Sequence, residues 1–562
     1  MPLEGDAAAL PLHDQPAMNT APSTAAKAGD AHYLLGVDVG TGSARAGIFD
    51  LTGRLVGSAS RELALFREAG TIVEQSSDDV WRAVCGAVKQ ALSEANVAPG
   101  GIAGIGFDAT CSLVVLGEGG SPLAVGPSGQ AERNIIVWMD HRAVDQAERI
   151  NATGHDVLKY VGGRISPEME TPKLLWLLEH RPAVFAAAWQ FLDLTDYLTW
   201  RATGDLARST CTVTCKWTYL AHEQRWDESY FRTVGLGVLA DEGFARIGQQ
   251  VAAPGTPRGR GLTVDAAAEL GLEAGTPVAT GVIDAHAGGI GTVGAGGDVQ
   301  TRLAYVFGTS SCTMTTTSQP VFVPGVWGPY FSAMVPDAWL NEGGQSVAGA
   351  AIDHLLAMHP AAAEASASAR RDGESLPAML VRLATGSGRV DLSRTVLRAN
   401  GLHVVPEFLG NRAPFADPQA RAVIAGLDME TGLDGLVAFY IAGICGIGYG
   451  LRQIIEVQAK AGAPVRQIVV SGGAGRSDLV RQLLADATGK PVLATQSEEP
   501  VLLGAAMLGG VAGERFGDVR SAMARMSRIA RTYEPASGAL AELHDSRFHA
   551  FERLQALARE IR

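Results

Sequence analysis

A glycine-rich segment near the N-terminus most constrains what this chain can fold into. Residues 34–39 are apolar or small apart from Asp38, and glycine, threonine and serine follow at once in residues 40–43. A second apolar run at residues 46–49 leads into a turn at 51–53. This pattern predicts a β-hairpin whose tip presents backbone N–H groups and hydroxyls, because glycine lets the backbone approach a phosphate closely. Asp38 would lie beside that tip, where it can bind a phosphate-bound Mg²⁺ through water.

Two later segments also lead an apolar strand into a turn of small residues. Residues 306–314 place a Gly-Thr-Ser turn between two β-prone runs. Residues 467–475 lead a buried strand into glycines, and Ser477 or Asp478 would cap the amphipathic helix that follows. Each turn alone is typical of an ordinary tight connection, but three in this order indicate two similar domains around one nucleotide. The candidate nucleotide-binding residues are Gly40, Thr41, Gly42, Ser43, Gly308, Thr309, Ser310, Gly472, Gly473, Ala474 and Ser477.

Length and composition agree with two domains and argue against several classes of protein. A chain of 562 residues is too long for one core. Its 47% hydrophobic and 19% charged residues are typical of a globular chain. The net charge of −13, without a basic stripe, argues against nucleic-acid binding. The six cysteines are scattered and lack the spacing of a zinc site, so we expect reduced thiols in a cytoplasmic protein.

Two segments call for separate interpretation. Residues 1–30 are rich in Ala, Pro, Asp and Thr and lack periodicity, which predicts a disordered tail rather than a secretory signal. Residues 435–451 are the best candidate for a membrane span, but they contain five glycines between Asp434 and Arg452. A buried core helix is the favoured interpretation, so we expect no membrane association.

Elsewhere apolar strands alternate with amphipathic helices, which is typical of α/β domains. The pattern predicts helices over residues 77–95, 187–200 and 437–458, and a strand over residues 102–108.

Residues 280–288 contain the best candidate for a catalytic group. A short apolar run ends at Asp284 and small residues follow, so the carboxylate can point into a cleft. A positioned aspartate can accept the proton of an alcohol while the alcohol oxygen attacks phosphorus. The local sequence leaves open that Asp284 only caps the following helix. His286 is interpreted as a structural group, or as one that supports a neighbouring site residue, and not as a catalytic one.

Three further stretches contain polar residues that suit a polyol. Thr110 and Cys111 follow a strand that ends at Asp108, Lys216 lies among small polar residues, and Glu342 precedes two glycines. A lysine and a carboxylate can hold sugar hydroxyls through charge-assisted hydrogen bonds. Seen alone, Lys216 is more typical of an ordinary exposed lysine and Glu342 of an ordinary loop glutamate.

Together these residues resemble the FGGY family of carbohydrate kinases, which belongs to the superfamily of sugar kinases, actin and heat-shock ATPases. The resemblance extends from about residue 33 to about residue 510. Residues 173–180 are similar to the core of the family's first signature, although Glu170 stands where the family usually has Pro, Ser or Thr. The resemblance implies two ribonuclease H-like domains around a cleft. The N-terminal domain would comprise residues 31–285 and the C-terminal domain residues 286–562.

The resemblance also implies a role for each motif. The three turns would contact the β- and γ-phosphates, the γ-phosphate and the adenosine of ATP, in that order. Asp284 would be the catalytic base. Lys216, Asp284 and Glu342 match the residues that hold the ketopentose in the ribulokinase branch, and Thr110 and Cys111 would line the same pocket. Residues 110–114 look more like the D-ribulokinase group than like bacterial L-ribulokinases. Residues 138–142 are a further family-like element, in which Asp140 and Arg142 would either organise the sugar pocket or form a surface ion pair.

The implied activity is transfer of the γ-phosphate of ATP, with Mg²⁺ bridging the phosphates, to the 5-hydroxyl of D-ribulose. L-Ribulose, xylulose, a pentitol or glycerol is the nearer alternative substrate. A non-catalytic ATP-binding protein of the same fold is the more distant alternative. Family members are often dimers, so a homodimer stays open.

Overall fold

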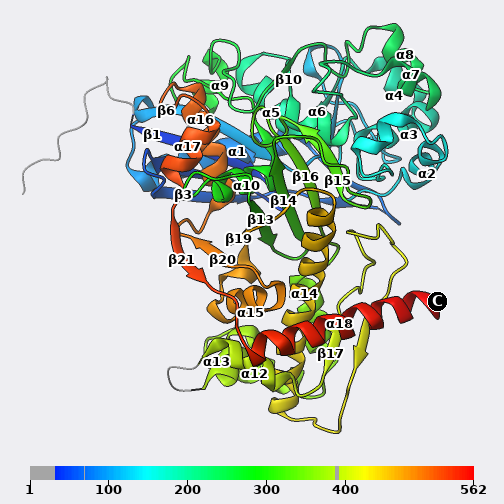
Figure 1. The fold of residues 1–562 in the computed structure, drawn as a ribbon. Helices are drawn as coiled ribbons and strands as arrows, with labels where there is room; N and C mark the ends of the chain where they lie inside the picture. Colours follow the sequence, from blue (N-terminus) through cyan, green and yellow to red (C-terminus); the bar gives the residue numbers. More distant parts are fainter. Residues whose placement is uncertain (1–31, 69, 387–390) are drawn as a thin grey trace, which may run out of the picture.

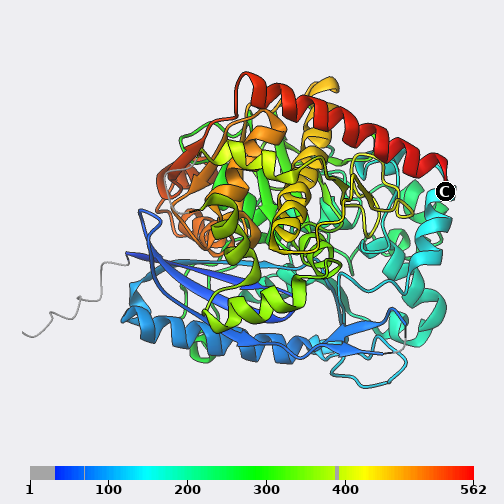
Figure 2. The same ribbon diagram turned by 90° about the horizontal axis from the view of Figure 1, so that it is seen from below.

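The computed structural model describes residues 32–68, 70–386 and 391–562 of the chain. The disordered tail predicted for residues 1–30 lies outside the described residues. In the described ranges, strands and helices are arranged around two large sheets, in agreement with the predicted α/β pattern (Figures 1 and 2).

The first sheet has the strand order β12-β6-β1-β2-β3. β1 and β2 form the predicted antiparallel hairpin, and β6 and β12 continue the sheet in parallel with β1. Asp38 of β1 pairs in register with Asp108 of β6, and Val282 of β12 pairs with Asp108 from the other side. The carboxyl ends of three parallel strands therefore meet at one edge, where α/β proteins commonly bind ligands. The strands are β1 (Tyr33–Val39), β2 (Ser43–Asp50), β3 (Leu55–Glu62), β6 (Ile102–Ala109) and β12 (Val282–Ile283).

Helices cover both faces of the first sheet. Because side chains alternate along a strand, Leu35 faces α1 (Ser77–Ala95) whereas Gly36 faces α16 (Pro500–Ala512). α10 (Asp284–Val293) packs beside α16. In Figure 1 the orange α16 lies next to the blue β1 and β6, so the chain returns to its first sheet near its end.

The second sheet, of order β15-β16-β14-β13-β19-β20-β21, repeats the local arrangement of the first. β13 and β14 form the second predicted hairpin, and β19 runs parallel to β13 as β6 does to β1. The two halves of the chain thus carry the same strand-turn-strand element beside a parallel strand. The strands are β13 (Arg302–Phe307), β14 (Ser311–Thr317), β15 (Trp327–Phe331), β16 (Trp339–Gln345), β19 (Gln467–Ser471), β20 (Val492–Thr495) and β21 (Ile529–Tyr533).

A third sheet of five short strands, in the order β4-β5-β8-β7-β9, two two-stranded sheets and further helices complete the described fold. The other strands are β4 (Phe66–Arg67), β5 (Val73–Gln75), β7 (Leu113–Leu116), β8 (Ile135–Ile136), β9 (Gln190–Asp193), β10 (Arg208–Ser209), β11 (Val251–Ala252), β17 (His403–Val405) and β18 (Val423–Ala425). The other helices are α2 (Val144–Ala152), α3 (Glu170–His180), α4 (Pro182–Ala187), α5 (Leu194–Thr203), α6 (Thr210–Lys216), α7 (Glu228–Thr233), α8 (Gly237–Asp241), α9 (Val264–Leu270), α11 (Gly349–Ala357), α12 (Ala362–Arg371), α13 (Leu376–Thr385), α14 (Leu433–Lys460), α15 (Asp478–Thr488), α17 (Val519–Met526) and α18 (Ala539–Glu560).

Most of the predicted elements agree with the structure, and one is wrong. α1, β6 and α14 confirm the helix, the strand and the long helix predicted at their positions. The helix predicted over residues 187–200 is wrong in its first half, because residues 190–193 form β9 and α5 begins only at Leu194. β9 pairs with β7 and buries Phe191 and Leu192, so long-range strand pairing overrides the local helical pattern.

α14 is long and apolar enough by length and composition to cross a membrane. However, 72% of its most apolar window is buried inside the protein. Its N-terminal part packs against α11 and α13, which agrees with the core helix predicted for residues 435–451.

Gly106 should be essential for the seating of α16. A Cβ atom at this position would collide with the carbonyl oxygen of Ala505, so Gly106→Ala must push the helix from the sheet. We expect Gly106→Ala to destabilise the protein by about 1–3 kcal/mol, measured as a lower midpoint of thermal or urea unfolding. Gly517→Ala is the matched control, because a Cβ there meets nothing within 4 Å. An unchanged midpoint for Gly106→Ala would contradict this packing.

Candidate active site

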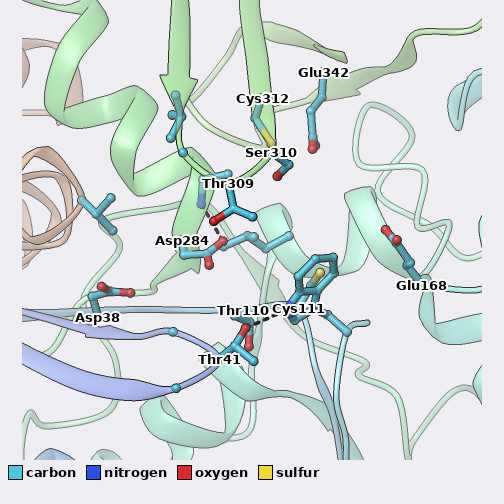
Figure 3. A pocket seen from close by; sticks show the side chains of 18 of the residues that line it. Asp38, Thr41, Thr110, Cys111, Glu168, Asp284, Thr309, Ser310, Cys312 and Glu342 are labelled. Carbon is cyan, nitrogen blue, oxygen red and sulfur yellow. Dashed lines mark hydrogen bonds between the residues drawn. The ribbon is translucent and has the colours of Figure 1, made fainter. Parts of the chain in front are cut away.

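A cavity of about 550 Å³ lies where the ends of the two hairpins face each other (Figure 3). Residues from both halves of the chain line it. From the first 280 residues these are Asp38, Gly40, Thr41, Gly42, Ser43, Arg45, Thr110, Cys111, Trp138, Glu168 and Lys216. From the remainder they are Ile283, Asp284, Ala285, Val306, Gly308, Thr309, Ser310, Cys312, Trp327, Glu342, Arg412 and Val501.

The cavity brings together the residues predicted for two of the three turns and for the sugar side. The third predicted group, Gly472, Gly473, Ala474 and Ser477, does not line it. This turn nevertheless adjoins the second one, because a Cβ at Gly472 would collide with the backbone of Phe307. Ser477 is the first residue before α15, as predicted, but its side chain makes no capping hydrogen bond.

Three aspartates meet at the strand ends on one side of the cavity. Asp38 and Asp108 are neighbours in register, and Asp284 follows the last residue of β12. Burial raises the pKa of Asp108 well above its usual range, and the charge of Asp38 adds to this effect. Apart from the carboxyl group of Asp38, neither carboxylate oxygen of Asp108 has a hydrogen-bond partner among the described residues. These carboxyl groups oppose one another's ionisation, so a bound cation would favour their charged forms.

Arg45 on β2 partly compensates this charge. Its Nε atom donates to Oδ2 of Asp38 at 2.8 Å, and its Nη1 atom donates to Oε2 of Glu499 at 2.7 Å. Burial opposes the charge on Arg45, but the two carboxylates outweigh it and raise the guanidinium pKa. Sequence reasoning missed Arg45, although it comes only two residues after the first predicted turn.

Asp284 is the first residue of α10 and also lines the cavity, near the middle of Figure 3. One of its oxygens, Oδ1, accepts a hydrogen bond from the Ala285 N–H at 2.7 Å. Burial raises the pKa of Asp284 to about 7, and the charge of Asp38 contributes in the same direction. A carboxylate with this pKa can exchange a proton at neutral pH.

Lys216 and Glu342 lie on the other side of the cavity, and neither is the exposed group that its local sequence left open. Lys216 ends α6, is buried, and has its ammonium 4.7 Å from the centre of the Trp327 ring. Burial opposes its charge, but acidic neighbours that include Glu342 raise its pKa well above the usual range. Glu342 extends from β16, and burial would raise its pKa. Lys216 and His286 outweigh that effect and lower the pKa of Glu342 to about 2.

Thr110 and Cys111 complete the floor of the cavity as predicted. The Thr110 hydroxyl lies 3.0 Å from that of Ser112, and both Thr110 and Cys111 are almost fully buried. Burial raises the pKa of the Cys111 thiol, so this side chain stays neutral. Figure 3 shows both residues below Asp284, on the side that belongs to the first sheet.

The segment at residues 138–142 contributes through a different residue from those predicted. Trp138 lines the cavity, and its ring N–H donates to the Thr41 hydroxyl at 2.9 Å. Asp140 and Arg142 do not line it, and they are not a surface ion pair either. Arg142 donates to Asp140 at 2.7 Å and to Glu74 at 2.8 Å, with all three side chains almost completely buried. The cluster is therefore a buried network behind Trp138.

Glu168 and Arg412 also line the cavity, and no sequence motif marks either residue. Glu168 faces His141, with Oε1 and Nε2 3.7 Å apart. Burial would raise the pKa of Glu168, but His141 and Arg412 lower it. The Arg412 guanidinium lies 5.6 Å from the centre of the Trp327 ring. Both residues come from connecting segments, so only the tertiary fold places them here.

Family profiles match most of the chain. The profile of the N-terminal domain of the FGGY family of carbohydrate kinases matches residues 33–291, and that of the C-terminal domain matches residues 303–513. The chain belongs to this family. It is therefore a carbohydrate kinase, and kinases of this family use ATP as the phosphate donor. The domain boundary predicted between residues 285 and 286 lies inside α10 and stays a prediction.

Individual relatives agree with this assignment. The chain is 44% identical to an FGGY carbohydrate kinase domain-containing protein of Homo sapiens, over 90% of this chain and 92% of that protein. It is 38% identical to a D-ribulokinase of Saccharomyces cerevisiae, over 87% of this chain and 73% of that protein. A solved xylulose kinase from Rhodospirillum rubrum covers 94% of this kinase and is itself covered to 99%, with a TM-score of 0.76 at 21% identity. This likeness confirms the predicted fold class, two ribonuclease H-like domains with a cleft.

Because the pKa of Asp284 is raised, its ionised form destabilises the folded state, and a neutral side chain at this position should remove that effect. The folded-state pKa of about 7 exceeds the usual 3.8, so ionising Asp284 destabilises the fold increasingly as pH rises between these values. We expect Asp284→Asn to raise the midpoint of thermal unfolding of the ligand-free kinase at pH 8 in the presence of a chelator. Near pH 4 the midpoints of the variant and the unmodified kinase should be nearly equal. The exposed Asp353→Asn should change the midpoint little at either pH. A lower midpoint for Asp284→Asn at pH 8 would contradict the assigned burial.

Proposed function

We propose that this kinase transfers the γ-phosphate of ATP to the 5-hydroxyl of D-ribulose, giving D-ribulose 5-phosphate and ADP. The observation that carries the proposal is that Asp284, Lys216 and Glu342 line one cavity together with the first two turns. The 38% identity to a D-ribulokinase supports the choice of sugar.

The two turns suit the phosphate end of the reaction. The backbone N–H groups and hydroxyls of residues 40–43 and 308–310 are preorganised donors that can stabilise charge on the transferred group. Residues 472–477 adjoin the second turn and would extend the site toward the adenosine.

The strand-end carboxylates fit Mg²⁺, which prefers oxygen ligands and keeps several waters. Asp38 lines the cavity, and the oxygens of Asp108 beside it have no hydrogen-bond partner other than Asp38 among the described residues. Asp38 would hold the ion through water, and the bound ion would neutralise charge on the ATP phosphates.

The remaining residues act on the sugar. As the bond forms between O5 of the sugar and the γ-phosphorus and the bond from that phosphorus to ADP breaks, Asp284 accepts the proton from O5. Lys216 and Glu342 are charged and buried, so their hydrogen bonds to sugar hydroxyls are strong and orient the ketopentose. Closure of the two halves would exclude water and limit hydrolysis of ATP.

Removal of the base should lower turnover without removing the ATP site. We expect Asp284→Asn to reduce kcat by about 10²–10⁴-fold. The unmodified enzyme should lose kcat/KM for sugar as pH falls below about 7, because protonated Asp284 cannot act as a base. Binding of an ATP analogue, measured by calorimetry, should be retained in the variant. Turnover that is unaffected by the substitution would rule out the role of Asp284.

The sugar is tested by release of ADP from Mg-ATP in the presence of D-ribulose, L-ribulose, D-xylulose, ribitol or glycerol. The comparison uses kcat/KM, since slow turnover at high sugar concentration would mislead. The highest kcat/KM should be that for D-ribulose. A preference for another sugar would replace D-ribulose but retain the kinase mechanism. Absence of sugar-dependent ADP release with all five would overturn the proposed substrate class.

A further inference from the structure

Cys211, His286 and Glu342 form an unbroken line of buried polar contacts that ends at the sugar side of the cavity. The Sγ atom of Cys211 lies 2.9 Å from Nδ1 of His286. The other ring nitrogen, Nε2, lies 3.2 Å from Oε2 of Glu342. Cys211 and His286 are fully buried, and of the three residues only Glu342 lines the cavity.

This line joins the three elements that carry the proposed sugar-binding and catalytic residues. Cys211 lies on α6, which ends at Lys216, and His286 lies on α10, which begins at Asp284. Glu342 lies on β16 of the other sheet. The Cys211 sulfur also accepts a weak hydrogen bond from the Ile283 N–H at 3.4 Å, immediately before Asp284. Through Cys211, the His286 imidazole is therefore linked to the backbone immediately before the proposed base, Asp284.

Charge along the line alternates. Burial would lower the pKa of His286, but Cys211 and Glu342 outweigh it and raise that pKa to about 10. Burial would raise the pKa of Cys211, but its contacts with Cys215 and His286 lower it to about 5. Both shifts favour a cationic imidazole beside Cys211, and Nε2 donates its hydrogen to Glu342, because an ionised carboxylate can only accept.

A metal ion does not account for this cluster, although Cys211, Cys215 and His286 bring their ligand atoms within 4.8 Å of one another. Two ligands of one tetrahedral zinc, with Zn–S of about 2.3 Å and Zn–N of about 2.0–2.1 Å, lie about 3.5 Å apart. The separation of 2.9 Å between Cys211 and His286 is that of a hydrogen bond.

Glu342 must stay available to a sugar although the cation of Lys216 attracts it, and its contact with His286 can keep it in place. Lys216 and Glu342 attract each other, but no ion pair within 4.0 Å joins them in the described part of the chain. A carboxylate drawn fully onto Lys216 would use up both groups and leave neither free for sugar hydroxyls. His286 offers Glu342 a second cation on the side away from the cavity.

We propose that His286 is a positioning residue that holds one oxygen of Glu342, so that the other oxygen stays directed at the sugar. Cys211 fixes the ring orientation that this requires. The inference rests on the proposed role of Glu342 in sugar binding. It gives a specific partner and a function in the kinase reaction to a side chain that the local sequence presents only as a structural or supporting group.

The test compares His286→Leu with His286→Gln in the full-length kinase. Leucine removes both contacts, and we expect KM for the preferred sugar to rise about 10–100-fold, the worth of a hydrogen bond to a charged group, while KM for ATP stays nearly unchanged. Glutamine keeps an N–H group near the place of Nε2 and should restore much of the loss. His544→Gln is the control, because His544 is also buried and contacts Tyr449 at 2.9 Å, far along the chain in α18.

A double-mutant cycle separates positioning from a general effect on folding. If His286 acts through Glu342, His286→Leu should change sugar KM little in a Glu342→Gln background. An equal fold-change in both backgrounds would overturn the proposal, as would parallel rises in the KM of sugar and ATP. If His286→Leu does not fold, Cys211→Ala replaces it in the same cycle, with a smaller rise in sugar KM expected.

Two further outcomes are distinguishable. The cycle uses whichever sugar the unmodified enzyme prefers, so a preference other than D-ribulose refutes the proposed substrate without touching His286. Stoichiometric zinc in the purified enzyme that disappears in His286→Leu would overturn the positioning role and assign the cluster to a metal instead.

Discussion

Placing carboxylates side by side at the buried ends of parallel strands is unfavourable, and the layout of the cleft follows from how that charge is compensated. Asp38, Asp108 and Asp284 are brought together by the register of β1, β6 and β12. Arg45 offsets part of the charge, and the rest leaves a site for cations that accompany phosphate. The same repulsion and burial raise the pKa of Asp284 toward neutrality, so one constraint supports both the proposed cation site and the proposed role of Asp284 as a base.

At the end of the cavity that we propose for the sugar, buried charges of both signs compensate one another. Here the buried charges are of both signs, with Lys216 and Arg412 around Trp327 and with Glu168 and Glu342 facing them. Because the signs balance, this end of the cavity attracts neither strong anions nor cations and instead offers strong donors and acceptors to a neutral polyol. One end of the cavity thus has mainly acidic side chains and the other has charges of both signs. This division matches the proposed binding of phosphate at the first end and of sugar at the second.

The sequence predicts those parts of the fold and site whose information is local. Both hairpins follow from apolar runs that end in small-residue turns, and Asp284 stands out where a strand meets small residues. Parts that depend on distant pairing escaped prediction. The local sequence of β9 is typical of a helix, and only its pairing with β7 makes it a strand. Arg142 and Glu74 are far apart in the sequence and form their ion pair only in the folded chain. Arg412 reaches the cavity from a connecting segment with no periodicity, so nothing local marks it.

The return of α16 to the first sheet has a consequence for biosynthesis. β1 and β6 leave the ribosome early, but the helix that covers the glycine-lined face at Gly36 and Gly106 is among the last parts of the chain to be made. A nascent chain can form the hairpin and pack α1, yet one apolar face of the sheet stays open to chaperones until α16 emerges. The N-terminal half is thus complete only after nearly the whole chain has been translated, so the first turn reaches its final surroundings only after the second turn has been made.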